Sequence, residues 1–241
     1  MQLEPLEQFV IKPIVPLHIG KFDVSFTNSA LLMTIAVLVV SAIVVIGTRR
    51  EELVPGRIQS LGELAYEFVG NMIDETVGAE GQRYFPFIFT LFMFILFGNL
   101  LGLIPFGYSF TGQIIVTFAM AAIVFIGVTL IGIWRHGWHF LSFFVPHGVP
   151  FVLLVLLVPI ELLSYLIRPF TLSIRLFANM LAGHTMLAIF GGFAASIGVL
   201  GLLPLGLDIL IFFLELLVAV LQAYVFAILT CLYLNDAIHL H

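Results

Sequence analysis

The stretch Leu172-Ser-Ile-Arg-Leu-Phe-Ala-Asn-Met-Leu-Ala-Gly-His184 places one arginine, Arg175, in a largely apolar part of the chain. A guanidinium stays protonated at every physiological pH. In the middle of a membrane it costs at least ~2.5 kcal/mol on insertion scales, so intramembrane arginines face a bundle interior or an aqueous cavity and commonly mark ion pathways. The stretch therefore predicts a membrane helix that carries a functional cation.

The composition of the whole chain is typical of a protein that lies in lipid. Of its 241 residues, 61% are hydrophobic and 10% are charged, and the mean hydropathy is +1.19. Several apolar runs approach the ~20 residues that cross a bilayer core as a helix. The net charge of -5 does not imply an acidic partner, because most carboxylates fall in two polar segments. We expect an all-α polytopic protein forming one membrane domain, residues 1–241.

The first part of the chain predicts one span followed by a basic connector. Residues 1–27 are expected to form an external N-terminal segment, without a cleaved signal peptide because no basic region precedes an apolar one. Residues 28–47 are the first span. Residues 48–84 form the connector, which the positive-inside rule assigns to the cytoplasm. Its basic residues are Arg49, Arg50, Arg57 and Arg83.

The connector contains an amphipathic helix, which we expect to lie on the membrane surface. Residues 85–134 then hold the second and third spans, 87–104 and 113–134, joined by a short uncharged external turn. Trp134 and Trp138 are predicted to anchor the end of the third span at the interface. The apolar residues of the amphipathic helix are Leu61, Leu64, Ala65, Phe68, Val69 and Met72, opposite Glu63, Glu67 and Asn71.

Residues 149–236 are predicted to form a long antiparallel pair of helices. The second, residues 203–236, would be about 50 Å long against a bilayer core of ~30 Å, so it must be steeply tilted or bent. Polar side chains recur every seven residues, which returns them to nearly the same helix face with a drift of about 20°. They are Glu161, Arg168 and Arg175 in the first helix and Asp208, Glu215 and Gln222 in the second.

Several contacts are expected within this pair. Arg168 should pair with Glu161 or extend to the interface, and Pro169 should kink the first helix without ending it. No acidic residue lies within four positions of Arg175, so its partner must come from another helix or another chain. A turn near residues 196–206 should bring His184 and Glu215 onto facing helices.

Small residues flank these polar groups and would let another backbone approach closely. Ala178 and Ala182 share the side of Arg175 and Asn179. On the second helix, Ala219, Ala223 and Ala227 form a row that we expect to face a partner protein.

The chain has no recognisable catalytic motif. It lacks the His-Glu-x-x-His, Gly-x-Ser-x-Gly and Gly-x-x-x-x-Gly-Lys-Ser/Thr patterns. His136, His139 and His147 are near one another, but no acidic or cysteine ligand accompanies them. We expect no metal, no cofactor and no nucleic-acid partner.

Three segments give the chain a resemblance to subunit a of F-type ATP synthases. The family's invariant arginine falls on Arg175, its asparagine on Asn179 and its glutamine on Gln222. Many bacterial members carry Glu where this chain has His184 and His where it has Glu215, an exchange that resembles mitochondrial and related bacterial members. The segments are Arg168-Pro-Phe-Thr-Leu-Ser-Ile-Arg-Leu-Phe-Ala-Asn-Met-Leu-Ala-Gly183, Gly98-Asn-Leu-Leu-Gly-Leu-Ile-Pro105 and Leu221-Gln-Ala-Tyr-Val-Phe226.

The resemblance implies a non-catalytic stator subunit that translocates protons. Two half-channels would lead to and from a carboxylate on each c subunit, with Arg175 separating them. The entry path would use His184 and Glu215 together with Asn179 and Gln222, while Glu161 would line the exit. The implied partners are the c-ring, the b subunits of the peripheral stalk, the rest of the complex and membrane lipid. The implied location is the bacterial inner membrane rather than the mitochondrial one.

Two other classes remain open at this point. An ion-coupled secondary transporter would also bury charges at mid-depth, but such proteins usually show paired interrupted helices in repeated halves. A redox or haem-binding subunit would need histidines within spans, and only His184 lies in one. A c-ring that co-purifies with the chain would separate the three classes.

Overall fold

The structure is a computed structural model that describes residues 10–16, 18–19, 22–23, 25–48, 56–104, 108–138, 140, 145, 151–197 and 201–239. The basic residues Arg49 and Arg50, and His139 and His147, lie outside this part of the chain. The elements are β1 (Pro13–Val15), β2 (His18–Ile19), β3 (Phe22–Asp23), β4 (Phe26–Thr27), α1 (Asn28–Thr48), α2 (Arg57–Thr76), the 3-10 helix η2 (Ala79–Tyr84), α3 (Phe85–Gly102), the 3-10 helix η3 (Phe110–Gly112), α4 (Ile114–His136), α5 (Phe151–Ser196) and α6 (Leu202–Ile238).

The predicted all-α membrane class is confirmed. Within the described residues, five helical segments are long and apolar enough to cross a membrane. In lipid a backbone must satisfy its own hydrogen bonds, and a helix does so within one segment. The five segments are Asn28–Gly47, Ala79–Gly102, Ile114–His136, Leu153–Ser196 and Leu202–Ile238.

Short strands precede the first helix, and the sequence did not predict them. β1 pairs antiparallel with β4, and β2 pairs antiparallel with β3. The Asn28 side chain joins this segment to the start of α1: its Oδ1 accepts a hydrogen bond from the Lys12 backbone N–H, and its Nδ2 donates to the Val10 carbonyl, both at 3.2 Å. The β1–β4 pair is therefore joined by these bonds to the start of a membrane helix.

The amphipathic helix α2 buries only one edge of its predicted apolar face. Val69 and Ile73 are fully buried in the main core. Leu61 and Leu64 are instead 54% and 71% exposed. The apolar residues of α2 thus divide between a row that packs against the protein and a row left open to the surroundings.

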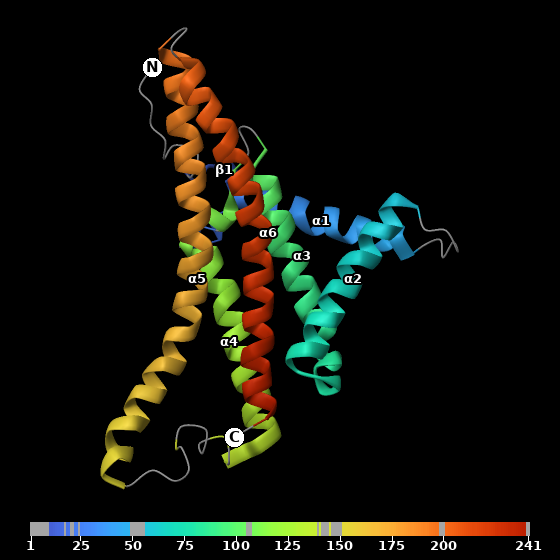
Figure 1. Cartoon of the computed structure of the whole chain (residues 1–241), viewed down its shortest axis with the longest axis vertical. Coiled ribbons are helices and arrows are strands. Elements are labelled where there is room, and N and C mark those ends of the chain that lie inside the picture. The colour runs from blue at the N-terminus through green and yellow to red at the C-terminus, as the bar shows by residue number, and fades with distance from the viewer. Residues whose placement is uncertain are drawn as a thin grey trace.

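The long helices α5 and α6 run side by side along the length of the molecule, and α1 lies across their long axis (Figure 1). If α1 crosses the bilayer along its own length, α5 and α6 must be steeply inclined. Helix α5 continues through Pro159 and Pro169, as predicted for Pro169. Its N-terminal half swings away from α4 and α6 (Figure 1), the bend that proline causes by removing a backbone hydrogen bond.

The row of alanines on α6 packs inside the chain. Ala219, Ala223 and Ala227 are each fully buried, and the Asn99 side-chain amide of α3 donates a hydrogen bond to the Ala219 carbonyl at 3.0 Å. The expectation that this row faces a partner protein is therefore wrong. The close approach that small residues allow is used by α3 of the same chain.

Gly98 on α3 makes room for an aromatic ring. A Cβ at position 98 would collide with the Phe110 ring, which is fully buried. The centroids of the Phe110 and Phe94 rings are 5.3 Å apart. We expect Gly98→Ala to destabilise the protein by ~1–3 kcal/mol, as overpacking does in a filled core. The measurement is the melting temperature of the purified full-length chain in detergent.

Gly127→Ala is the matched control, because a Cβ at position 127 meets nothing within 4 Å. Its melting temperature should equal or slightly exceed that of the wild type, since alanine is the better helix former. Equal melting temperatures for the two variants would contradict the packing argument at Gly98.

Candidate functional site

His184 of α5 and Glu215 of α6 meet inside the long helix pair. Their Nε2 and Oε1 atoms are 3.6 Å apart, and the two side chains are 8% and 2% exposed. The structure thus brings together two groups that lie 31 residues apart in the sequence. Groups at this separation can exchange a proton after a small approach or through one water molecule.

Gly183 allows the Glu215 carboxylate to reach this position. A Cβ on residue 183 would lie 2.6 Å from Glu215 Oε1 and 2.7 Å from its Cδ. Any side chain at position 183 would therefore occupy the space that the carboxylate fills. Helical periodicity cannot show which residue of α6 lies opposite Gly183, so the sequence alone does not reveal this contact.

The Glu215 carboxylate is buried without a hydrogen bond from any described residue. Burial of a polar group without a hydrogen bond costs a few kcal/mol, and burial of a charge costs much more. The group therefore needs a proton, a water molecule or a close approach of the neighbouring imidazole. This requirement suits a residue that passes protons rather than one that only packs.

Asp208 lies two helical turns before Glu215 on α6 and is half-buried. Its Oδ1 atom is buried and accepts no hydrogen bond from the described part of the chain. A Cβ on Gly191 of α5 would lie 3.7 Å from Asp208 Oδ2. Each of these two carboxylates thus faces a glycine of α5. Its seven-residue spacing from Glu215 predicts a shared helix face, but not the glycine of α5 that lies opposite it.

Arg175 is exposed on a different side of α5, with Ala178 and Ala182 exposed beside it. It forms no ion pair with a described residue. Nine residues separate it from His184, or about 13 Å along a helix axis at 1.5 Å per residue. Arg175 therefore stands apart from the buried pair, on a face made narrow by small side chains.

The other predicted site residues are half-buried and lie along the same two helices. Asn179 is between Arg175 and His184 on α5, and Gln222 follows Glu215 by two turns on α6. Glu161 belongs to the half of α5 that swings away from α6 (Figure 1). The structure does not bring Glu161 to the His184–Glu215 pair.

Arg168 pairs with a carboxylate that the sequence analysis did not consider. Its Nη1 atom lies 2.9 Å from Oδ2 of Asp236, near the end of α6, rather than beside the expected Glu161. The guanidinium also lies over the rings of Tyr165 and Tyr233, at 5.3 and 4.9 Å from their centroids. The expected pairing with Glu161 was wrong because spacing along one helix cannot reveal a partner 68 residues away.

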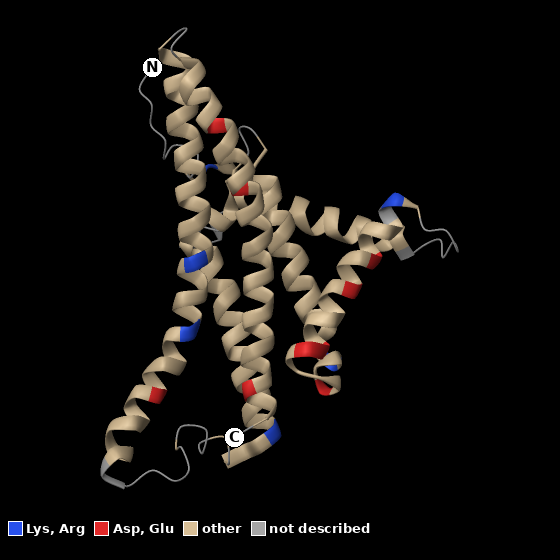
Figure 2. Ribbon diagram, in the orientation of Figure 1, with Lys and Arg blue, Asp and Glu red and all other residues tan. Residues whose placement is uncertain are grey.

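The charges divide between the two long helices, as Figure 2 shows. The charged residues of α5 are Arg168, Arg175 and Glu161, whereas every charged residue of α6 is acidic. Residues of opposite charge therefore lie on neighbouring helices, where attraction is strong because lipid screens it poorly. The acidic residues of α6 are Asp208, Glu215 and Asp236.

Comparison with known proteins identifies relatives over nearly the whole chain. The family model described as ATP synthase A chain matches residues 30–235. ATP synthase subunit a of Paramagnetospirillum magneticum is 52% identical over 244 residues, covering 98% of this chain and 99% of that protein. The subunit a of Rhodospirillum rubrum is 52% identical over 238 residues, with the same coverage. That of Pelagibacter ubique is 51% identical over 243 residues and covers both chains fully.

Gly183→Ala should destabilise the protein by ~1–3 kcal/mol, because the new methyl group collides with the Glu215 carboxylate. The same change in a Glu215→Ala background should cost much less, since the colliding group is gone. Melting temperatures of the four chains give the coupling between the two positions. Simple addition of the two single effects would contradict the direct contact, because touching residues usually couple by at least ~0.5 kcal/mol.

Proposed function

This chain belongs to the ATP synthase A chain family, as a multi-pass membrane subunit of a rotary ATP synthase, and on that premise we propose that it passes protons through two half-channels separated by Arg175. One observation carries the proposal: a permanent cation lies on an open, small-residue face of α5, the helix that also supplies the imidazole of the buried His184–Glu215 pair. With this family membership, the transporter and redox-subunit alternatives are set aside.

Arg175 would act on a carboxylate of the c-ring. Ala178 and Ala182 leave the adjacent surface of α5 narrow enough for a partner helix to approach closely. A cation within a few ångströms stabilises the ionised form of a carboxylic acid. A protonated c subunit arriving at Arg175 would therefore release its proton before it passes. The same positive charge would repel a proton that moved directly from one half-channel to the other.

The entry half-channel would run along the contact between α5 and α6. Asp208, with one buried carboxylate oxygen, and the fully buried Glu215 are successive acidic groups on α6, and His184 faces the second of them. An imidazole changes its charge near neutral pH and can both accept and donate a proton. Asn179 and Gln222 would supply neutral hydrogen-bonding groups between this pair and Arg175.

The exit half-channel would use Glu161, in the half of α5 that diverges from α6. The partners would be the c-ring on the Arg175 side and the b subunits of the peripheral stalk elsewhere on the surface. The complex would lie in the bacterial inner membrane. This chain would carry out none of the ATP chemistry itself, and its contribution would be the path of the ion.

Arg175→Ala should abolish ATP-driven proton pumping in vesicles while the subunit still assembles with the complex. Arg175→Lys should fail as well, because an ammonium group can lose its proton when desolvated and lacks the planar fork of a guanidinium. The measurement is quenching of a pH-sensitive dye, with subunit content of the purified complex as the assembly control. Near wild-type pumping by the alanine variant would overturn the proposed role of Arg175.

His184 and Glu215 should behave as one unit. His184→Glu places two acids at the contact and Glu215→His places two imidazoles there, so each single change should slow pumping, by about 10²-fold if the lost step is a general acid–base transfer. The double exchange restores one acid and one imidazole and should recover part of the rate. Pumping rates of the four complexes at several pH values test this. Single losses that simply multiply in the double variant would mean that the residues act independently.

A further inference from the structure

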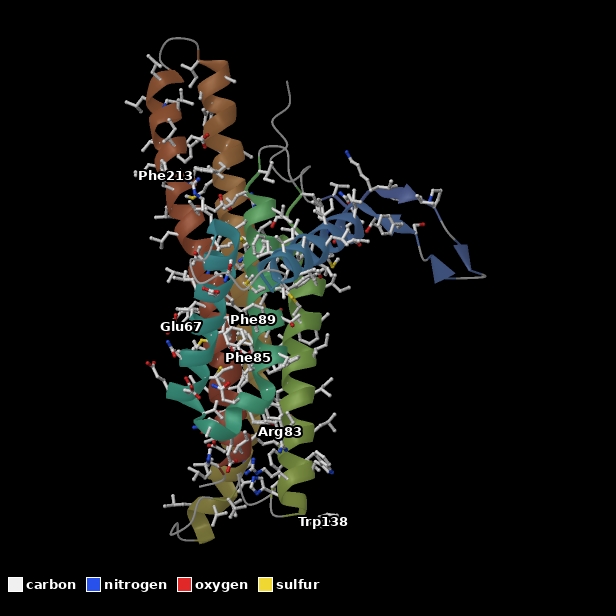
Figure 3. The ribbon with its side chains drawn as sticks, turned by 90° about the vertical axis from the view of Figure 1, so that its right-hand side faces the viewer. Glu67, Arg83, Phe85, Phe89, Trp138 and Phe213 are labelled. Atoms are coloured by element: carbon white, nitrogen blue, oxygen red, sulfur yellow. The ribbon has the colours of Figure 1, made fainter. Side chains whose placement is uncertain are left out.

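A cavity of about 560 Å³ lies between η2 and the C-terminal end of α4, away from the proposed ion path. Two arginines from different elements line it, Arg83 of η2 and Arg135 of α4. Figure 3 shows Arg83 between η2 and the lower part of α4, with Trp138 beyond it at the end of α4. Trp134, also on the cavity wall, is 90% exposed. Exposed tryptophans are typical of the boundary between lipid and water.

The charge of this cavity fits one monovalent anion. Glu80 forms an ion pair with Arg135 across the cavity, so these two charges cancel. Arg83 forms no ion pair with any described residue and is exposed. One positive charge is therefore left over, beside a second guanidinium that still has free N–H groups. Arginine binds phosphate oxygens through several N–H donors at once.

An apolar groove continues from the same cavity. Its volume is about 180 Å³, and it shares Tyr84 and Ile131 with the cationic cavity. It follows α3 and α4 toward the middle of the bundle, along Phe87, Ile123 and Gly127. A Cβ at Gly127 would meet nothing within 4 Å, so the missing side chain keeps the groove open.

We infer that the cavity and the groove together bind one anionic phospholipid. Arg83 and Arg135 hold the phosphodiester of the headgroup, and an acyl chain occupies the groove between α3 and α4. A free phosphate would fill the cationic cavity alone and would leave the groove unused, so the continuity of the two favours a lipid. Basic pockets between membrane helices are a recurring way of binding such headgroups.

The test uses Trp134 as a reporter. The chain has two tryptophans, so Trp138→Phe leaves Trp134 as the single one. This full-length variant is reconstituted in phosphatidylcholine vesicles containing a minor fraction of lipid with brominated acyl chains, which quench nearby tryptophan fluorescence. Brominated phosphatidylglycerol should bind about fivefold more tightly than brominated phosphatidylcholine, the preference expected for one net positive charge near the surface.

Charge variants should change this preference in opposite directions. Arg83→Gln removes the net charge and should bring the ratio close to one. Glu80→Gln frees Arg135 and should raise the ratio above the wild-type value. Arg57→Gln on α2, outside both cavities, is the matched control and should leave the ratio unchanged. If Arg83→Gln and Glu80→Gln both leave the binding ratio unchanged, as the control does, the site does not distinguish lipids by headgroup charge and the inference fails.

The groove and the nature of the anion are tested separately. Gly127→Leu fills the groove while leaving both arginines in place, and it should reduce quenching by brominated phosphatidylglycerol. Unchanged quenching in this variant would show that no acyl chain lies there. Inorganic phosphate at millimolar concentration should not compete with the lipid. If phosphate removed the preference for phosphatidylglycerol, the site would be one for a free anion and the lipid assignment would be wrong.

Discussion

A charged or acidic group in a membrane must find a polar partner or a proton, because lipid offers neither hydrogen bonds nor screening. Most of the arrangement of α5 and α6 follows from this constraint. Arg168 finds Asp236, and His184 finds Glu215, in both cases on the opposite helix. The two longest helices are thus joined by polar contacts at points far apart along their lengths. Arg175 of α5, in contrast, is exposed and forms no ion pair with any described residue.

Small residues decide where helices and side chains can come this close. Gly183 leaves the space that the Glu215 carboxylate occupies. Ala219, Ala223 and Ala227 let α3 approach α6 until the Asn99 amide reaches a backbone carbonyl. One helix, α6, therefore has two specialised sides: a polar side turned toward α5 and a small side turned toward α3. The remaining side is bulky, apolar and exposed, as suits contact with lipid or with another subunit.

The division of α6 changes which surface remains for a partner. With its alanine row buried, the narrow open surface near the proposed ion path is the one on α5 that carries Arg175, Ala178 and Ala182. A partner helix that approaches there meets the unpaired guanidinium at once. A row of small side chains is thus buried by packing within the chain on α6, whereas the corresponding small side chains on α5 remain exposed. A cationic cavity at the end of α4 lies apart from both and has the exposed Trp134 on its wall.

The sequence by itself determined the membrane class, the ranges of the long helices, the continuation of α5 through Pro169 and the meeting of His184 with Glu215. These depend on hydropathy and on helical spacing within a segment, together with one turn that reverses the chain. Only the tertiary structure decided that Arg168 pairs with Asp236, that the alanines of α6 are buried, that α2 buries one edge of its apolar face, and that Gly183 lies against Glu215. Periodicity reports which residues share a face, but not which neighbour covers that face. That choice is made by packing between segments distant in the chain, because shape and charge complementarity depend on which helices lie side by side.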